Sequence, residues 1–220
     1  EAVARYPKRF FASVQVDPFS KDAASTLEHY ASLSRPNVFK MEISEQYGWS
    51  GMHRDLRVFD SPGMSDLWDI ALKYKMAVMF DTGLIGTNGY QTEQFAKLAD
   101  AYPSLPIIIE HGCMCKNDFD TDSELRPQWD AMAKLGRKEN IYMGLTAIVE
   151  TAGNMERAMW VLEHLLNIAG ERKIVWGSDI PGNMRFWTYN NMIEWAEKAP
   201  CLTERQKDLF LAQNMLDMFK

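Results

Sequence analysis

The sequence has few cysteines, no long apolar run and no excess of positive charge. Its 220 residues include three cysteines, which is an odd number and a small one for this length, so the sequence does not indicate a disulfide framework. A reducing, cytoplasmic setting is therefore expected. No apolar run approaches the about 18 residues that a membrane span needs, and no signal-peptide pattern opens the chain. The formal net charge of −6 argues against a nucleic-acid partner, because phosphate binding needs basic patches.

Linkers and repeats are also missing. There is no Pro/Ser-rich linker, no low-complexity segment and no internal repeat, so we expect a single domain over residues 1–220. The sequence opens at Glu1 without an initiator methionine, and Tyr6 to Arg9 lead directly into an apolar strand-like segment. We therefore expect the domain to be truncated at its N-terminus.

Short apolar segments alternate with amphipathic segments along the chain. Helices are expected near 21–34, 61–74, 91–102, 123–136, 155–169, 186–198 and 203–219, and strands over 10–16, 37–43, 76–80, 105–110, 140–145 and 174–176. This alternation predicts a parallel sheet with helices outside it. The strands recur about every 30 residues, close to the spacing of an eight-unit barrel. The expected fold is α/β, of the (β/α)8 TIM-barrel type but incomplete, with about six βα units; either two units are missing or the sheet is open.

Polar side chains follow the expected strands. The residues just past the strand ends are Asp17, Glu42, Asp81, His111, Thr146 and Asp179. In a parallel barrel these ends converge on one face, where ligands bind. Acids and a histidine that converge there suit a metal site or acid–base chemistry. The alternative is that each residue caps a helix or closes a turn.

Other side chains are candidates for contact with a substrate. Lys40 and Arg54 could pair with a substrate carboxylate. Trp49 could line a pocket, although a place in the core is more usual for tryptophan. We also expect Glu42 and Ser178 in the substrate site. The pair formed by Cys113 and Cys115 lacks the spacing of most zinc or redox sites, and is expected to pack near His111.

Several of these segments resemble a known family. Val175-Trp176-Gly177-Ser178-Asp179-Ile180-Pro181 is similar to the final-strand signature of the amidohydrolase superfamily, in the amidohydrolase-related branch that contains aminocarboxymuconate semialdehyde decarboxylase and pyrone dicarboxylate lactonase. The resemblance covers essentially all 220 residues. The other similar segments are 9–18, 39–42, 102–112, 140–143 and 214–216, which resemble the third, fourth, sixth and seventh strands and the C-terminus of that family.

The resemblance implies a metal-assisted barrel. In the family the first strand supplies a His-x-His pair, the fifth and sixth strands supply one histidine each, and the eighth supplies an aspartate. Carried over, His111 is the sixth-strand histidine, Asp179 is the eighth-strand aspartate, and Asp81 stands where the fifth-strand histidine is found. The His-x-His pair and the first two strands are not in this chain. The implied metal ligands are Asp81, His111 and Asp179, and the implied cofactor is a divalent ion, zinc or manganese.

Two functions follow as hypotheses. The leading one is a metal-dependent hydrolase or carboxy-lyase that acts on a small carboxylated or lactone-like substrate. In it Asp179 is a general base or a ligand that orients water, and His111 polarises the substrate. The alternative is a non-catalytic, truncated or degenerate barrel that serves as a structural or binding protein. The absence of the His-x-His pair and the presence of Asp81 in place of a histidine favour this alternative. A small-molecule substrate is the expected partner, with no nucleic acid and no membrane, and a homodimer is the commonest oligomer.

Overall fold

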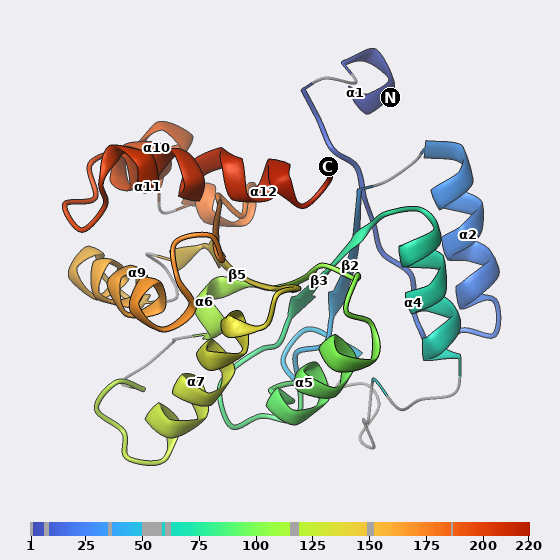
Figure 1. Ribbon diagram of the computed structural model, residues 1–220, viewed down its shortest axis with the longest axis horizontal. Helices are drawn as coiled ribbons and strands as arrows, with labels where there is room; N and C mark the ends of the chain where they lie inside the picture. The colour runs from blue at the N-terminus through green and yellow to red at the C-terminus, as the bar shows by residue number, and fades with distance from the viewer. Residues whose placement is uncertain are drawn as a thin grey trace.

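A sheet of six parallel strands forms the centre of the computed structural model, which describes residues 2–6, 9–34, 37–49, 59, 63–114, 119–148, 152–185 and 187–220 (Figure 1). The strand order in the sheet is the order in the chain, and every neighbouring pair is parallel. The parallel sheet predicted from the sequence is therefore confirmed. The strands are β1 (Ser13–Val14), β2 (Val38–Glu42), β3 (Ala77–Asp81), β4 (Ile107–Ile109), β5 (Ile141–Thr146) and β6 (Ile174–Gly177).

Helices follow the strands one by one, as parallel connections require. In Figure 1, α2, α4, α5, α7 and α9 pass around one side of the sheet, and the last helices gather at the top, in red. The helices of the described chain are α1 (Ala2–Arg5), α2 (Ala23–Ser34), α4 (Met64–Lys73), α5 (Thr92–Ala101), α6 (His111–Met114), α7 (Leu125–Lys134), η2 (Leu135–Arg137), α9 (Met155–Ala169), η3 (Gly182–Arg185), α10 (Tyr189–Glu197), α11 (Glu204–Asp208), the π-helical η4 (Leu209–Gln213) and α12 (Asn214–Asp217).

The local sequence explains where these helices lie and end. The buried residues of α4 include Leu67, Ile70 and Ala71, which share one face at helical spacing. Asn154 accepts a hydrogen bond from the N–H of Arg157 and so caps α9. Thr203 and Gln206 cap α11 reciprocally. The pattern of apolar and capping residues is thus sufficient to fix most of the units.

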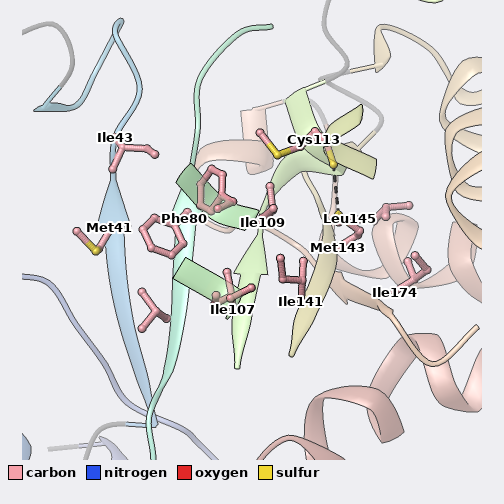
Figure 2. Packing of buried hydrophobic residues seen from close by; sticks show 14 of the residues in the cluster. Met41, Ile43, Phe80, Ile107, Ile109, Cys113, Ile141, Met143, Leu145 and Ile174 are labelled. Atoms are coloured by element: carbon pink, nitrogen blue, oxygen red, sulfur yellow. Dashed lines mark hydrogen bonds between the residues drawn. The ribbon is translucent and has the colours of Figure 1, made fainter. Parts of the chain in front are cut away.

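The main core lies between the sheet and the helices. Figure 2 shows its side chains standing on alternate positions of β2 to β6, so they all project from one face of the sheet. The labelled residues of the strands, and Ile43 just after β2, are buried: Met41, Ile43, Phe80, Ile107, Ile109, Ile141, Met143, Leu145 and Ile174.

The intervening positions face the other way, and we call this side the inner face. A second, smaller cluster lies on it, formed by Ala77, Ile108 and Val175. Met215 and Phe219, at the end of the chain, pack against this cluster, and the ring of Phe219 lies 5.1 Å from that of Phe11. The last helix therefore covers part of the inner face, and polar residues occupy the strand ends.

The structure corrects the predicted extent of two elements. Residues 10–16 were expected to be a strand, but only Ser13–Val14 pair with β2, because β1 is at the edge of the described sheet and has one neighbour. The single helix expected over 203–219 is divided into α11, η4 and α12. Of the helices in the described ranges, none combines the length and the apolar character needed to cross a membrane.

Candidate active site

Three acidic side chains lie in one row at the carboxyl ends of neighbouring strands. Glu42 is paired in register with Asp81, the last residue of β3. Glu110 directly follows Ile109, which is paired with Phe80, so it lies beside Asp81. Since alternate residues face opposite sides, Glu42, Asp81 and Glu110 share the inner face. We call these three residues the acidic row.

Lys40 lies one pleat below the row and pairs with its third member. The Nζ atom of Lys40 is 2.6 Å from Oε2 of Glu110. Burial would lower the pKa of Lys40, but the charge and hydrogen bond of Glu110, with the charges of Asp81 and Glu42, raise it above its usual value. Lys40 therefore stays an ammonium ion and neutralises one of the three carboxylates.

His111 is directed toward the row by an unusual backbone. His111, Gly112 and Cys113 have consecutive φ values of 58°, 60° and 62°, so the short element α6 begins as a left-handed turn. The indole N–H of Trp129 donates to the carbonyl of Gly112 at 2.8 Å and braces this turn. The turn brings the ring of His111 back over the strand end instead of letting it follow a regular helix.

Both ring nitrogens of His111 are engaged. Nε2 lies 3.2 Å from Oδ2 of Asp81, and Nδ1 lies 2.8 Å from Oγ1 and 3.2 Å from the carbonyl oxygen of Thr146. The backbone N–H of His111 also donates to Oγ1 of Thr146 at 3.1 Å. The ring is thus held between β3 and β5, and the residue is only 6% exposed.

The pair formed by His111 and Asp81 is ionised at neutral pH. Burial alone would lower the pKa of His111, but the hydrogen bond and charge of Asp81, with the charges of Glu110 and Asp179, raise it to about 9. Burial would raise the pKa of Asp81, whereas His111 and the N–H of Gly83, 3.0 Å from Oδ1, lower it to about 2. The site therefore contains an imidazolium–carboxylate pair.

Glu42 is the residue of the row that exchanges protons near neutral pH. Burial, and then the negative charge of Asp81, raise its pKa to about 7. The N–H of Ser44 donates to its Oε1 at 3.1 Å and partly opposes this rise. A carboxyl group with this pKa is suited to general acid–base catalysis at physiological pH.

Asp179 and Ser178 lie on the neighbouring loop, after β6. Asp179 is exposed, and its φ of 54° places it in the left-handed region. It lies near enough to His111 for its charge to raise the pKa of that ring. Ser178 is half-buried, and its carbonyl oxygen accepts a hydrogen bond from Nδ2 of Asn183 at 3.0 Å. Asp179 is therefore the carboxylate of the site that water reaches most easily.

Other predicted residues make core or turn contacts. Trp49 is buried in the main core, with its ring 6.5 Å from Phe19 in an edge-on contact. Asp17 accepts a hydrogen bond from the N–H of Phe19 at 3.0 Å, as a turn residue does. Cys113 packs as predicted, buried with Sγ 3.3 Å from Sδ of Met143 (Figure 2). Arg54 and Cys115 lie outside the described residues.

Sequence reasoning missed Glu110 and Gly177. Glu110 follows three isoleucines, and that uniformly apolar run conceals which positions face inward. A Cβ atom built on Gly177 would lie 2.4 Å from Cγ2 of Thr146, so only glycine leaves room for the side chain that holds His111. Its place as the last residue of the predicted strand 105–110 is the signal that could have found Glu110; nothing in the sequence signals the role of Gly177.

The described donors do not fit a divalent metal ion as they are arranged. Both ring nitrogens of His111 are engaged in hydrogen bonds within the protein, and Asp81 already accepts from His111 and Gly83. Among the described ranges, no three His, Cys, Asp or Glu side chains are grouped so that they could hold a metal ion. Of the predicted ligands, Asp81 and His111 contact each other, and Asp179 lies on the adjacent loop. Metal analysis of the purified protein would test the expectation of zinc or manganese directly.

Comparisons with known proteins agree with this architecture. Residues 1–220 match the sequence profile of a family described as Amidohydrolase. Similar solved structures include a probable 2-pyrone-4,6-dicarboxylic acid hydrolase of Acinetobacter baumannii with citric acid bound (TM-score 0.74, 14% identity, 99% of this chain and 76% of that one). Another is a 2,6-dihydroxybenzoate decarboxylase of Rhizobium (TM-score 0.64, 15% identity, 99% and 73%).

A third similar structure is an amidohydrolase of Burkholderia multivorans with bound zinc (TM-score 0.72, 13% identity, 99% of this chain and 75% of that one). No curated protein sequence matches the chain. At these identities the structural likeness speaks to the fold, and it confirms the TIM-barrel type predicted from the sequence.

Proposed function

Because the chain belongs to the amidohydrolase family, we propose that it is a hydrolase or a decarboxylase acting on a small carboxylated or lactone-like substrate. Two solved structures that share its fold are named as a pyrone dicarboxylic acid hydrolase and a dihydroxybenzoate decarboxylase. Both names refer to acids built on a small ring. The likeness supports the substrate class, whereas the type of reaction has to be argued from the residues of the site.

The observation that carries the proposal is the group formed by Glu42, Asp81 and His111 at the carboxyl ends of β2, β3 and β4. It combines a buried cation, a permanent anion and a carboxyl group with a pKa of about 7. This edge of a parallel barrel is where active sites are built. A purely structural ion pair would not require the third, proton-exchanging group.

In this proposal each group has a separate role. Asp179, which is exposed, takes a proton from the water that attacks a lactone carbonyl. The positive charge of His111 stabilises the negative oxygen that forms. Glu42, in its protonated form, gives its proton to the leaving oxygen. In a decarboxylation the same proton would pass to the carbon that loses carbon dioxide.

Turnover of defined probes tests the proposal. The purified protein is incubated with 2-pyrone-4,6-dicarboxylate, 2,6-dihydroxybenzoate and a simple γ-lactone, and acid or carbon dioxide release is measured. We expect turnover of at least one probe, and a loss of about 10²-fold or more in Asp179→Asn and His111→Ala. Circular dichroism checks that both variants are folded.

Asp17→Asn is the matched control, because Asp17 also follows a strand but only closes a turn. It should retain wild-type turnover. Wild-type rates in both Asp179→Asn and His111→Ala would overturn the assignment of the site. No turnover of any probe by the wild-type protein would favour a non-catalytic barrel with a structural or binding role.

A further inference from the structure

A small cavity lies beside the end of β6, next to the loop that carries Asp179. Its lining includes Ile148, Trp176, Asn183, Trp187, Met192 and Trp195. The water-accessible space in it is about 20 Å³, which is enough for about one water-sized group. Most of its wall is aromatic or aliphatic.

Two polar atoms of this lining lack a hydrogen-bond partner among the described residues. They are the amide oxygen Oδ1 of Asn183 and the indole Nε1 of Trp195. Both residues are only 5% exposed. An unpaired buried donor or acceptor destabilises the folded protein, and such atoms are rare in folded proteins. Oδ1 of Asn183 thus lacks a donor and Nε1 of Trp195 lacks an acceptor, and both residues belong to the lining of the same cavity.

The rest of the structure fixes both residues. Nδ2 of Asn183 donates to the carbonyl of Ser178 at 3.0 Å, and its backbone N–H donates to the carbonyl of Asp179 at 3.1 Å. The amide is therefore oriented, and its oxygen is the atom that remains. Trp195 belongs to α10, and its ring lies 6.2 Å from that of Phe210, edge-on.

We propose that Asn183 and Trp195 form a subsite for an uncharged hydroxyl group on the ring of the substrate. A hydroxyl both accepts and donates, so it can accept from Nε1–H of Trp195 and donate to Oδ1 of Asn183. A carboxylate has no proton to give and would leave the amide oxygen unpaired. An ammonium group cannot accept from the indole, and the apolar wall disfavours any charge.

The inference deepens the proposed function, on which it rests for its link with turnover. It narrows the substrate class to ring acids or lactones that carry a hydroxyl group. Because Asn183 also contacts the backbone of Asp179, a hydroxyl held here would place the adjoining ring at the same strand end as the proposed base.

Binding of matched probes tests the subsite without requiring turnover. The three hydroxybenzoates are compared with the three methylbenzoates of the same shape by calorimetry. For at least one position, the wild-type protein should bind the hydroxy compound about 10-fold or more tightly than its methyl analogue, since a methyl group leaves both atoms unpaired. The indole N–H resonance of Trp195, assigned from its loss in Trp195→Phe, should shift with that hydroxy probe alone.

Two variants and a control complete the experiment. Trp195→Phe keeps an aromatic ring and removes only the donor, and Asn183→Ala removes the acceptor. Each should reduce the hydroxy-to-methyl preference to about 3-fold or less. Met132→Leu, in the main core and outside this lining, should keep the full preference. Thermal melting checks the fold of each.

The outcomes separate this inference from the proposed function. A hydroxy-to-methyl preference that is absent in the wild type, or unchanged in Trp195→Phe, overturns the subsite. Failure of every probe to bind overturns it as well. Turnover of a probe without the preference leaves the proposed function intact. A preference without any turnover supports the subsite and counts against the enzyme.

Discussion

Lys40 of β2 and Glu110, the residue after β4, form an ion pair across β3, with 2.6 Å between Nζ and Oε2. The side chain of Glu110 is 5% exposed and that of Lys40 is 28% exposed. The pair therefore lies mostly inside the protein, next to the other two carboxylates of the acidic row. The positive charge of Lys40 offsets the negative charge of Glu110, so this ion pair sets the net negative charge of the acidic row.

Replacement of Lys40 by methionine should destabilise the protein. The methylene stem would still pack, but Glu110 would be left as a buried carboxylate without its cation. Loss of one partner of a buried pair costs about 3 kcal/mol. We expect a decrease of this size in the free energy of unfolding, measured by urea denaturation at pH 7.

Two comparisons make that result specific. Adding Glu110→Gln to Lys40→Met should recover much of the loss, because the stranded charge is then removed. Lys73→Met breaks a pair with Glu28 in which both side chains are largely exposed, and should leave stability unchanged. If Lys40→Met and Lys73→Met changed the free energy of unfolding by the same amount, the buried ion pair would stabilise the protein no more than the exposed one.

The pair formed by Asp81 and His111 should make stability depend on pH in two ranges. The pKa of His111 is raised from 6.5 to about 9, so its contribution is fully present below pH 6.5 and is lost as pH rises through 9. The pKa of Asp81 is lowered from 3.8 to about 2, so its contribution is present above pH 3.8 and is lost as pH falls toward 2.

Urea denaturation between pH 2 and pH 10 measures this dependence. The interaction is worth about 3 kcal/mol, counted once for the pair. In Asp81→Asn we expect the loss of stability above pH 7 to be much reduced, and NMR titration should show the pKa of His111 lowered. An unchanged titration of His111 in Asp81→Asn would show that the carboxylate is not its main partner.

Glu42 should control the pH dependence of turnover. If it gives a proton as proposed, kcat falls as pH rises through about 7, the pKa of this carboxyl group. Glu42→Gln should abolish that limb and lower kcat by about 10² to 10⁴-fold. Glu45→Gln, at an exposed position of the same loop, is the control and should keep the wild-type profile. A rate that instead rises through pH 7 would make Glu42 a proton acceptor.

Asn214 should be a determinant of stability at the end of the chain. Its Nδ2 donates to the carbonyls of Glu171 and Ile174, at 2.8 Å and 2.7 Å, and it is 2% exposed. Asn214→Leu leaves both carbonyls without this donor, so we expect a loss of about 2 kcal/mol in the free energy of unfolding. Met215→Leu, a swap of similar volume, should cost clearly less. Equal effects would mean that packing, and not these hydrogen bonds, holds α12.

The fold could be predicted from the sequence because the periodicities are strong. Apolar segments of strand length separated by amphipathic helices determined the parallel order, and the structure has strands at all six predicted places. The last segment was misjudged because its apolar spacing continues across α11, η4 and α12 as if one helix were present. Spacing alone does not reveal a π-helical turn.

The site could be predicted only in part. Asp81 and His111 were predicted to meet, and they do, because the ends of parallel strands converge. The pairing of Lys40 with Glu110 depends on register across three strands, and the raised pKa of Glu42 depends on burial. Neither register nor burial can be obtained from single residues. The unpaired atoms of Asn183 and Trp195 depend on the packing of α10 against the loop after β6.

Gly177 influences the position of His111, although it has no side chain that could take part in the reaction. Any larger residue there would press on the methyl group of Thr146, and Thr146 holds the ring of His111 from the side opposite to Asp81. Because Gly177 of β6 carries only a hydrogen atom in place of a side chain, Thr146 can keep the position that sets the tilt of the His111 imidazole. A single methyl group added at this position would reach the histidine through one intermediary, Thr146.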